Sequence, residues 1–316
     1  MKYYIAADGG GTKLFAVLYD QDFNIITYAS CGGTNHLFRP KEEIERDVAI
    51  LADTLIPDFV EEVEALDYSI VGNAGPLIEA LQKKVVIRTA ERRGEGHTAL
   101  LTAAHEYGIL AQAGTGSDAF LIQPDRELVI GGWGAYLGDE GSGYDIGIKT
   151  LKAAIYAYDG RGPATRIYDI LMQDWELDDM WDVINKKIAP TPDFRRLIAS
   201  ATRICGKAAA EGDPVAIEIF RDAAEELALQ VKTAIRQAGG TWTGPIVTSG
   251  GAWKSSPYLS SFFTEIIRAD YPDAVVIGPM FEPIVGNVLL RHKDTVGLGT
   301  LVDILKDKFK NYVCGV

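Results

Sequence analysis

Hydrophobic and polar positions along the chain predict two successive α/β regions. In the first region, apolar segments without helical periodicity indicate three strands joined by short turns, and further strands then alternate with helices. The predicted strands cover residues 3–7, 14–19, 24–30, 68–71, 85–88 and 108–113. Three antiparallel strands followed by strand–helix alternation are typical of a mixed sheet with helices on both faces.

Each predicted helix has one apolar face. After Pro40, apolar side chains stand at spacings of four, three and four, which predicts an amphipathic helix with the buried face Ile44, Val48, Leu51 and Leu55. Two later stripes predict helices with the faces Ile148, Leu151, Ile155 and Tyr158, and Ala224, Leu227, Val231, Ala234 and Ala238. Ser256 and Pro257 are typical of the first positions of a further helix.

The strand pattern restarts at residue 108. The segment "GILAQAGTGSDAFLIQPDRELVIGGW" predicts strand, glycine turn, strand, turn and strand, as at the N-terminus. This repeat of architecture predicts an α/β protein of two lobes, residues 1–113 and 114–316, with the last helix able to pack back on the first lobe. A cleft between two such lobes is the usual place for a small-molecule ligand.

Composition and charge narrow the range of partners. Hydrophobic content of 47% and charged content of 24% in 316 residues are typical of a soluble globular protein. A net charge of −13 argues against nucleic acid or an anionic membrane as a main partner, although a local nest of N–H groups can still bind phosphate. The three cysteines are far apart in sequence, and we see no signal peptide or membrane span, so we expect a cytoplasmic protein.

Three glycine loops carry the candidate chemistry: residues 8–13 (DGGGTK), 114–117 (GTGS) and 249–251 (SGG). The first places an acid beside bare backbone N–H groups, which can bind phosphate while the carboxylate holds a magnesium ion; an ordinary glycine-rich hairpin is the alternative. DGGGTK lacks the spacing of a P-loop. GTGSDA matches a dinucleotide-binding pattern, but a strand follows it rather than the helix that the pattern requires.

In their order and context, the three loops resemble the two phosphate loops and the adenosine loop of the actin-like ATPase superfamily. The segment "GGWGAYLGDEGSGYDIG", residues 131–147, resembles the signature of the N-acetylglucosamine kinase branch of the BadF/BadG/BcrA/BcrD ATPase family. Residues 32–38 and 282–290 also fall where that branch has similar segments. The resemblance covers nearly the whole chain and implies two ribonuclease H-like lobes with the active site in the cleft between them.

The resemblance implies ATP and Mg²⁺ as cofactors and an amino sugar as substrate: N-acetylglucosamine, or a relative such as glucosamine or N-acetylmuramic acid. It assigns Asp8 to the metal side of the catalytic site. It assigns phosphate or nucleotide binding to Gly10, Gly11, Thr12, Lys13, Gly114, Thr115, Gly116, Ser117, Gly250 and Gly251. It assigns sugar contacts to Asn35, Gly132, Trp133 and Asp139. Lys13 as a solvated hairpin residue and Asn35 as a turn residue remain alternatives.

One position departs from that branch. The branch has a catalytic Asp about 19 residues before the second phosphate loop, and this register falls on Glu95. We predict Glu95 as the general base; a plain helix-start residue is the alternative, and Glu91 is a rival. Two other functions stay open: a non-catalytic sugar or nucleotide sensor, and an ATPase that activates a 2-hydroxyacyl-CoA dehydratase. A homodimer is compatible with the sequence.

Overall fold

The protein is described by a computed structural model that covers residues 1–10, 13–36, 39–191 and 193–314. It divides into two compact units: Met1–Glu106 together with Pro279–Val316, and Tyr107–Gly278. This division differs from the predicted one, because the first boundary follows Glu106 rather than residue 113. The C-terminal segment from Pro279 groups with the first unit.

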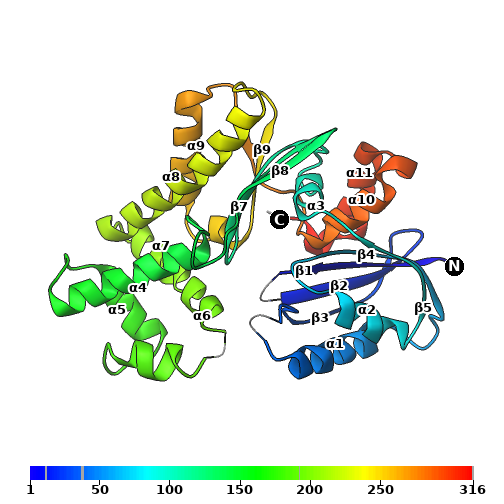
Figure 1. Cartoon of the computed structure of the whole chain (residues 1–316), viewed down its shortest axis with the longest axis horizontal. Helices are drawn as coiled ribbons and strands as arrows, with labels where there is room; N and C mark the ends of the chain where they lie inside the picture. Colours follow the sequence, from blue (N-terminus) through cyan, green and yellow to red (C-terminus); the bar gives the residue numbers. More distant parts are fainter. Residues whose placement is uncertain (11–12, 37–38, 192, 315–316) are drawn as a thin grey trace. The chain divides into compact units, whose positions relative to one another are not determined.

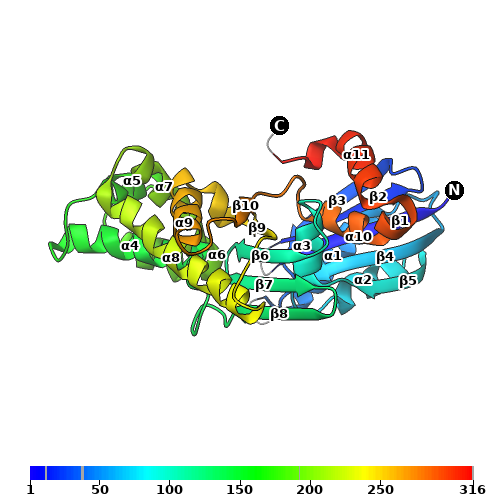
Figure 2. The same cartoon turned by 90° about the horizontal axis from the view of Figure 1, so that it is seen from above.

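The first unit is a five-stranded mixed sheet with helices on both faces (Figures 1 and 2). Its strand order is β3-β2-β1-β4-β5; β1, β2 and β3 are antiparallel, and β4 and β5 join β1 in parallel. The strands are β1 (Tyr3–Gly9), β2 (Lys13–Asp20), β3 (Ile25–Gly32), β4 (Glu62–Ile70) and β5 (Val86–Arg92). The helices are α1 (Lys41–Leu55), α2 (Gly75–Gln82), α3 (Glu95–Leu101), α10 (Ile284–Val296), α11 (Leu298–Lys308) and η3 (Lys310–Tyr312).

Alternation along β1 gives the first unit two cores. Ile5 and Ala7 face the cluster that α1 and α2 complete, whereas Ala6 faces the cluster that α10 and α11 complete. The period of two residues in a strand sends neighbouring side chains to opposite faces of the sheet. The four apolar residues predicted for the helix after Pro40 are all buried in α1, so that prediction is confirmed.

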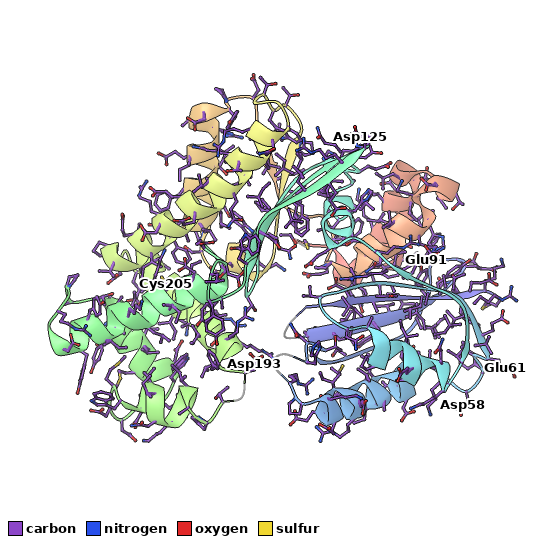
Figure 3. All side chains as sticks on the ribbon, viewed as in Figure 1. Asp58, Glu61, Glu91, Asp125, Asp193 and Cys205 are labelled. Atoms are coloured by element: carbon purple, nitrogen blue, oxygen red, sulfur yellow. The ribbon has the colours of Figure 1, made fainter. Side chains whose placement is uncertain are left out.

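The second unit contains a sheet of the same connectivity, with the order β10-β9-β6-β7-β8. Its strands are β6 (Gly108–Ala113), β7 (Ser117–Gln123), β8 (Arg126–Gly131), β9 (Pro245–Ser249) and β10 (Val275–Ile277). Its helices are α4 (Gly143–Asp159), α5 (Arg166–Asp174), the π-helix η1 (Val183–Ile188), α6 (Phe194–Ser200), α7 (Thr202–Ala210), α8 (Pro214–Gln237), η2 (Gly251–Lys254) and α9 (Pro257–Asp270). Cys205 lies in α7 (Figure 3) and is buried in the core of this unit.

The helix predictions in the second unit have mixed outcomes. Ser256 caps α9 as predicted, because its side chain accepts a hydrogen bond from the N–H of Tyr258. The stripe predicted for α4 is confirmed in part: Leu151 is buried, and Ile148 and Ile155 pack half-buried against the same core, but Tyr158 is exposed. Small residues complete the buried face, since Gly143, Gly147, Thr150 and Ala154 share it with Ile146 and Leu151. Scoring large apolar residues alone misses such a face.

Two strands of the first unit are longer than predicted. β4 begins at Glu62 and β5 ends at Arg92, because charged residues on these strands mask their alternation. No helix in the described part of the chain combines the length and apolarity that a membrane span requires.

Candidate functional site

The Asp8 carboxylate stands near the carboxyl end of β1, where side chains from two other elements hold it. The hydroxyl of Ser69, on β4, donates to Asp8 Oδ1 at 3.0 Å. Asn287 of α10 is fully buried, and its Nδ2 donates to the Ser69 hydroxyl at 2.8 Å and to the carbonyl of Ala7 at 3.1 Å. A chain of hydrogen bonds thus fixes the carboxylate in one orientation.

The pKa of the Asp8 carboxyl group also differs from its ordinary value. Burial raises the pKa of Asp8 from 3.8 to about 6, against the lowering effect of the Ser69 hydrogen bond. The negative charge of Glu95 raises this pKa further, whereas Lys13 lowers it. Asp8 is therefore largely ionised at neutral pH, and a cation placed beside it would relieve the unfavourable burial of its charge.

The first glycine loop opens onto a cavity of about 380 Å³, which Asp8, Gly10, Lys13, Glu282 and Tyr312 help to line. Among the described residues, no atom that would obstruct a side chain on Gly10 lies within 4 Å of its first carbon, so these residues leave the backbone there open to a ligand. Lys13 Nζ lies 5.2 Å from the centre of the Phe15 ring, in line with the solvated-hairpin alternative. The predicted phosphate ligands Gly11 and Thr12 lie outside the described residues.

Glu95 is the first residue of α3, as predicted, and its charge acts on Asp8. The rival Glu91 is engaged elsewhere. Its carboxylate (Glu91 is labelled in Figure 3) accepts one hydrogen bond from Arg291 at 2.9 Å and forms an ion pair with Arg93 at 2.8 Å. The Arg291 bond lowers the pKa of Glu91. This geometry favours Glu95 over Glu91 as the proton acceptor, and the base role of Glu95 stays a prediction.

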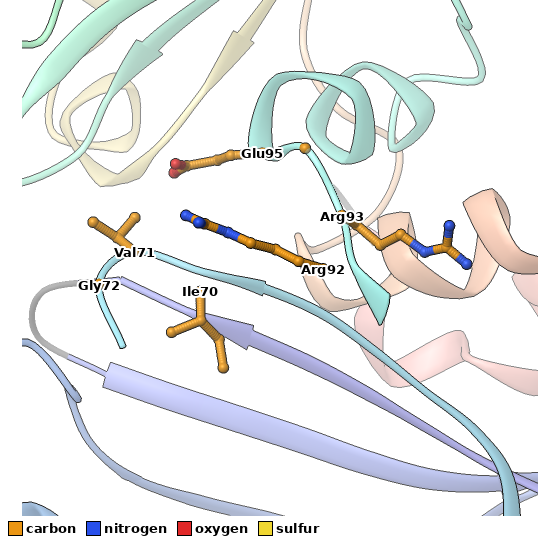
Figure 4. A pocket seen from close by; sticks show the side chains of 7 residues that line it. Ile70, Val71, Gly72, Arg92, Arg93 and Glu95 are labelled. Atoms are coloured by element: carbon orange, nitrogen blue, oxygen red, sulfur yellow. The ribbon is translucent and has the colours of Figure 1, made fainter. Parts of the chain in front are cut away.

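Glu95 also lines a second cavity, of about 360 Å³, with Ile70, Val71, Gly72 and Arg92 (Figure 4). Asn35 is close to this cavity, because the Cβ position of Gly72 lies 3.6 Å from the Asn35 Cα. Gly72 has a φ of +103°, a conformation that glycine adopts readily. The structure thus brings the predicted sugar residue Asn35 and the predicted base to the same part of the first unit.

The second glycine loop docks on the beginning of α4. The N–H of Gly143 donates to the carbonyl of Gly114 at 2.8 Å, and the N–H of Tyr144 donates to the carbonyl of Thr115 at 3.2 Å. The Ser142 side chain caps α4 by accepting from the N–H of Asp145. The capped helix therefore fixes the conformation of the loop.

Asp139, predicted as a sugar ligand, faces the second glycine loop. Its Oδ1 accepts from the N–H of Ser117 at 3.4 Å, and its Oδ2 accepts from Arg195 at 3.3 Å. A side chain on Gly116 would begin 2.9 Å from this carboxylate, so the carboxylate would have to move to make room for it. Burial raises the pKa of Asp139, which the Ser117 N–H and Arg195 both oppose. The sugar role of Asp139 stays a prediction.

The third glycine loop lies beside the second. Gly250 has a φ of +109°, and a side chain there would approach the carbonyl of Ala113 and the N–H of Gly114. Gly251 has open space on its side-chain side. The predicted adenosine loop and second phosphate loop therefore meet within the second unit.

Gly132 and Trp133 begin the turn after β8. The Gly132 N–H donates to the carbonyl of Ser117 at 3.1 Å, so the turn is anchored next to the second glycine loop. Trp133 exposes 77% of its surface in this structure. The sugar contacts predicted for both residues stay predictions.

Three residues that support these groups were missed in the sequence: Ser69, Asn287 and Arg195. Asn287 stands inside the segment 282–290 that carries the family resemblance, but nothing in the local sequence connects it to Asp8. Such contacts join residues 61 and 218 positions apart, so only the fold can reveal them.

The two sheets with their glycine loops define the class: the fold is that of the actin-like ATPases, with two ribonuclease H-like units. A solved structure from Chromobacterium violaceum, provisionally described as an N-acetylglucosamine kinase, superposes with a TM-score of 0.70. It is 22% identical and covers 92% of this chain and 99% of its own. This likeness supports the fold.

Within that class, the chain belongs to the BadF/BadG/BcrA/BcrD ATPase family, whose model matches residues 7–290. It is 29% identical over 307 residues to an N-acetylmuramic acid/N-acetylglucosamine kinase of Clostridium acetobutylicum, an alignment that covers 93% of this chain and 99% of the relative. It is 26% identical over 313 residues to an N-acetyl-D-glucosamine kinase of Dictyostelium discoideum, covering 91% and 97%. The predicted family is therefore confirmed.

Proposed function

We propose that this protein is a sugar kinase that transfers the γ-phosphoryl group of ATP to a hydroxyl of an amino sugar, N-acetylglucosamine or a close relative. The observation that carries the proposal is the pair of carboxylates Asp8 and Glu95 in the first unit, where the negative charge of Glu95 raises the pKa of Asp8. The family and the activities of the curated relatives support the same reaction.

In this proposal Glu95 is the general base. A sugar hydroxyl in the cavity beside Glu95 transfers its proton to the carboxylate as the hydroxyl oxygen attacks the γ-phosphorus, and ADP leaves with the electrons of the broken P–O bond. Gly72 lines this cavity and Asn35 lies next to Gly72, so we propose that both meet the sugar. Asn35 suits the hydroxyl groups, because an amide both donates and accepts hydrogen bonds.

Asp8 fits the magnesium ion that such kinases use. Only its Oδ1 accepts from Ser69, and the described residues contain no group of three or more Asp, Glu, His or Cys placed to bind a metal. One carboxylate together with waters and substrate phosphates is a common donor set for Mg²⁺. When bound, the ion neutralises charge on the phosphates.

Loops of both units are proposed to bind the nucleotide. Gly10, with Gly11, Thr12 and Lys13, supplies the first phosphate loop. The second phosphate loop is formed by Gly114, Thr115, Gly116 and Ser117. The adenosine part of ATP can approach the backbone closely at Gly250 and Gly251. Asn35, Gly132, Trp133 and Asp139 are proposed sugar residues.

A coupled ADP-release assay over amino sugars, N-acetyl sugars and plain hexoses tests the proposal. We expect ADP release with an N-acetylhexosamine or glucosamine, a product heavier by one phosphoryl group in the mass spectrum, and little release without sugar. Sugar and nucleotide binding without any phosphorylation would contradict the proposal and favour a sensor.

A further inference from the structure

Asn287 is the polar exception among the buried residues of α10. The other buried residues of this helix carry apolar side chains or none: Ile284, Val285, Gly286, Val288 and Leu289. Asn287 is fully buried, and its Oδ1 has no hydrogen-bond partner among the described residues. A buried polar atom without a partner lowers stability, and an apolar side chain would avoid that cost. The amide at this position therefore indicates a role beyond packing.

The carbonyl of Ala7 determines which way the amide of Asn287 faces. The two groups lie 3.1 Å apart, and a backbone carbonyl oxygen can only accept a hydrogen bond. The nitrogen of the amide must therefore face Ala7, because the amide oxygen there would set two acceptors against each other. Since Ala7 belongs to the backbone of β1, the sheet itself fixes this orientation.

The direction of this bond is passed on to Asp8. The same Asn287 nitrogen lies 2.8 Å from the Ser69 hydroxyl oxygen, which must accept because an amide nitrogen only donates. A hydroxyl has a single hydrogen, and that of Ser69 is then left for Asp8 Oδ1, 3.0 Å away. Asp8 Oδ1 is thus always an acceptor, and no hydrogen bond from another described residue reaches Oδ2.

This arrangement suits a cation on one oxygen of the carboxylate. Asp8 lines the cavity of about 380 Å³ at the first glycine loop, so a ligand there can reach the carboxylate. Mg²⁺ demands near-ideal octahedral geometry and therefore benefits from a ligand that cannot rotate. A Ser69 hydroxyl turned the other way would present its lone pairs to Oδ1, and the repulsion would turn the carboxylate.

We propose that Asn287 is a positioning residue for the magnesium ion: through Ser69 it keeps Asp8 Oδ1 as an acceptor and so reserves Oδ2 for the ion and its water ligands. Asn287 itself touches neither the ion nor a reactant. Partners that orient a metal ligand change metal affinity without binding the metal. This inference rests on the proposed function, in which Asp8 stands on the metal side of the site.

The test measures how strongly magnesium assists nucleotide binding. Calorimetric titrations with ADP, in MgCl₂ and in EDTA, give two affinities whose ratio reports the contribution of the ion. Asn287→Ala and Ser69→Ala should each lower this ratio by about tenfold relative to the wild type, with the ADP affinity in EDTA changed by less than about twofold. Asn287→Leu, which fills the space of the amide, should do the same and serves if Asn287→Ala does not fold.

Leu289→Ala is the matched control. Leu289 is fully buried on the same helix, and the change removes as many non-hydrogen atoms as Asn287→Ala without deleting a hydrogen bond to Ser69. It should leave the ratio within about twofold of the wild type, because loosened packing of α10 alone does not turn the Ser69 hydroxyl. The double variant of Asn287→Ala and Ser69→Ala should lose no more than Ser69→Ala, since Asn287 acts through Ser69.

Three results would overturn the inference. The first is a loss in Asn287→Ala or Asn287→Leu that is equal in MgCl₂ and in EDTA, which a merely structural role predicts. The second is a double variant in which the two single losses multiply. The third is an Asp8→Asn variant that keeps the wild-type ratio. The titrations need no sugar, so they decide the role of Asn287 even if the proposed function fails and no sugar releases ADP.

Discussion

The two units of the protein place different side chains at the same point of one topology. In the first unit Asp8, the penultimate residue of β1, is in register with Ser69 on β4. In the second unit Gln112, the penultimate residue of β6, is in register with Ser249 on β9. A carboxylate in one unit thus corresponds to an amide in the other.

The two glycine loops are also stabilised differently. Asp8, beside the first, is held by side chains of β4 and α10, and it keeps a negative charge next to the loop. The second loop is held by N–H groups of α4 and by the Asp139 carboxylate. The shared topology fixes where the strand ends lie. The residue at the matching position, Asp8 in the first unit and Gln112 in the second, decides whether that strand end can hold a cation.

We expect the largest effect on kcat from a change at Glu95, a residue outside the comparison of Asp8 with Gln112. Glu95→Gln keeps size and hydrogen bonding but removes basicity, so kcat should fall by about a hundred- to ten-thousandfold. Isothermal calorimetry should show unchanged binding of sugar and of ATP. Glu91→Gln is the matched control and should keep most of the turnover, because Glu91 is paired with Arg291. Wild-type kcat in Glu95→Gln would remove Glu95 from the mechanism.

Asp8 and Gln112 test the comparison directly. Asp8→Asn makes the first unit resemble the second, and kcat should fall by about a hundredfold or more through loss of the metal-side charge. Gln112→Ala should reduce kcat by less than about tenfold, since an amide supplies no charge. Circular dichroism checks that both variants are folded. Equal losses in the two variants would mean that Asp8 acts only as a structural residue.

Asp8 should also make stability depend on pH. Its folded-state pKa of about 6 lies above the unfolded value of 3.8, so the folded protein binds the proton more tightly. The free energy of unfolding therefore falls as pH rises from 3.8 to 6, by at most about 3 kcal/mol, and the loss is complete above that window. Urea unfolding of magnesium-free wild type and Asp8→Asn should show this difference. A constant difference between the two proteins from pH 4 to 7 would exclude it.

The sequence predicted the glycine loops, the strand pattern and the family, because these depend on local residue types. It could not predict the contacts that hold Asp8, since Ser69 and Asn287 reach it only through the fold. It also assigned Asp139 to the sugar alone, because a family pattern names positions and not the direction of a side chain. Part of the buried face of α4 was missed because Gly143, Gly147, Thr150 and Ala154 share it with Ile146 and Leu151.

The smallest expected effect separates two roles of Asp139. The carboxylate contacts Ser117 and Arg195, so Asp139→Ala should loosen the second glycine loop and raise the KM for ATP by about tenfold. If Asp139 also contacts the sugar, as the resemblance implies, the sugar KM should rise as well. Asp159→Ala is the control, because Asp159 pairs with Arg161 at the end of α4 and touches neither loop. If only the sugar KM increases, the second glycine loop does not depend on Asp139. The Asp139 carboxylate could then no longer be counted among the groups that stabilise this loop.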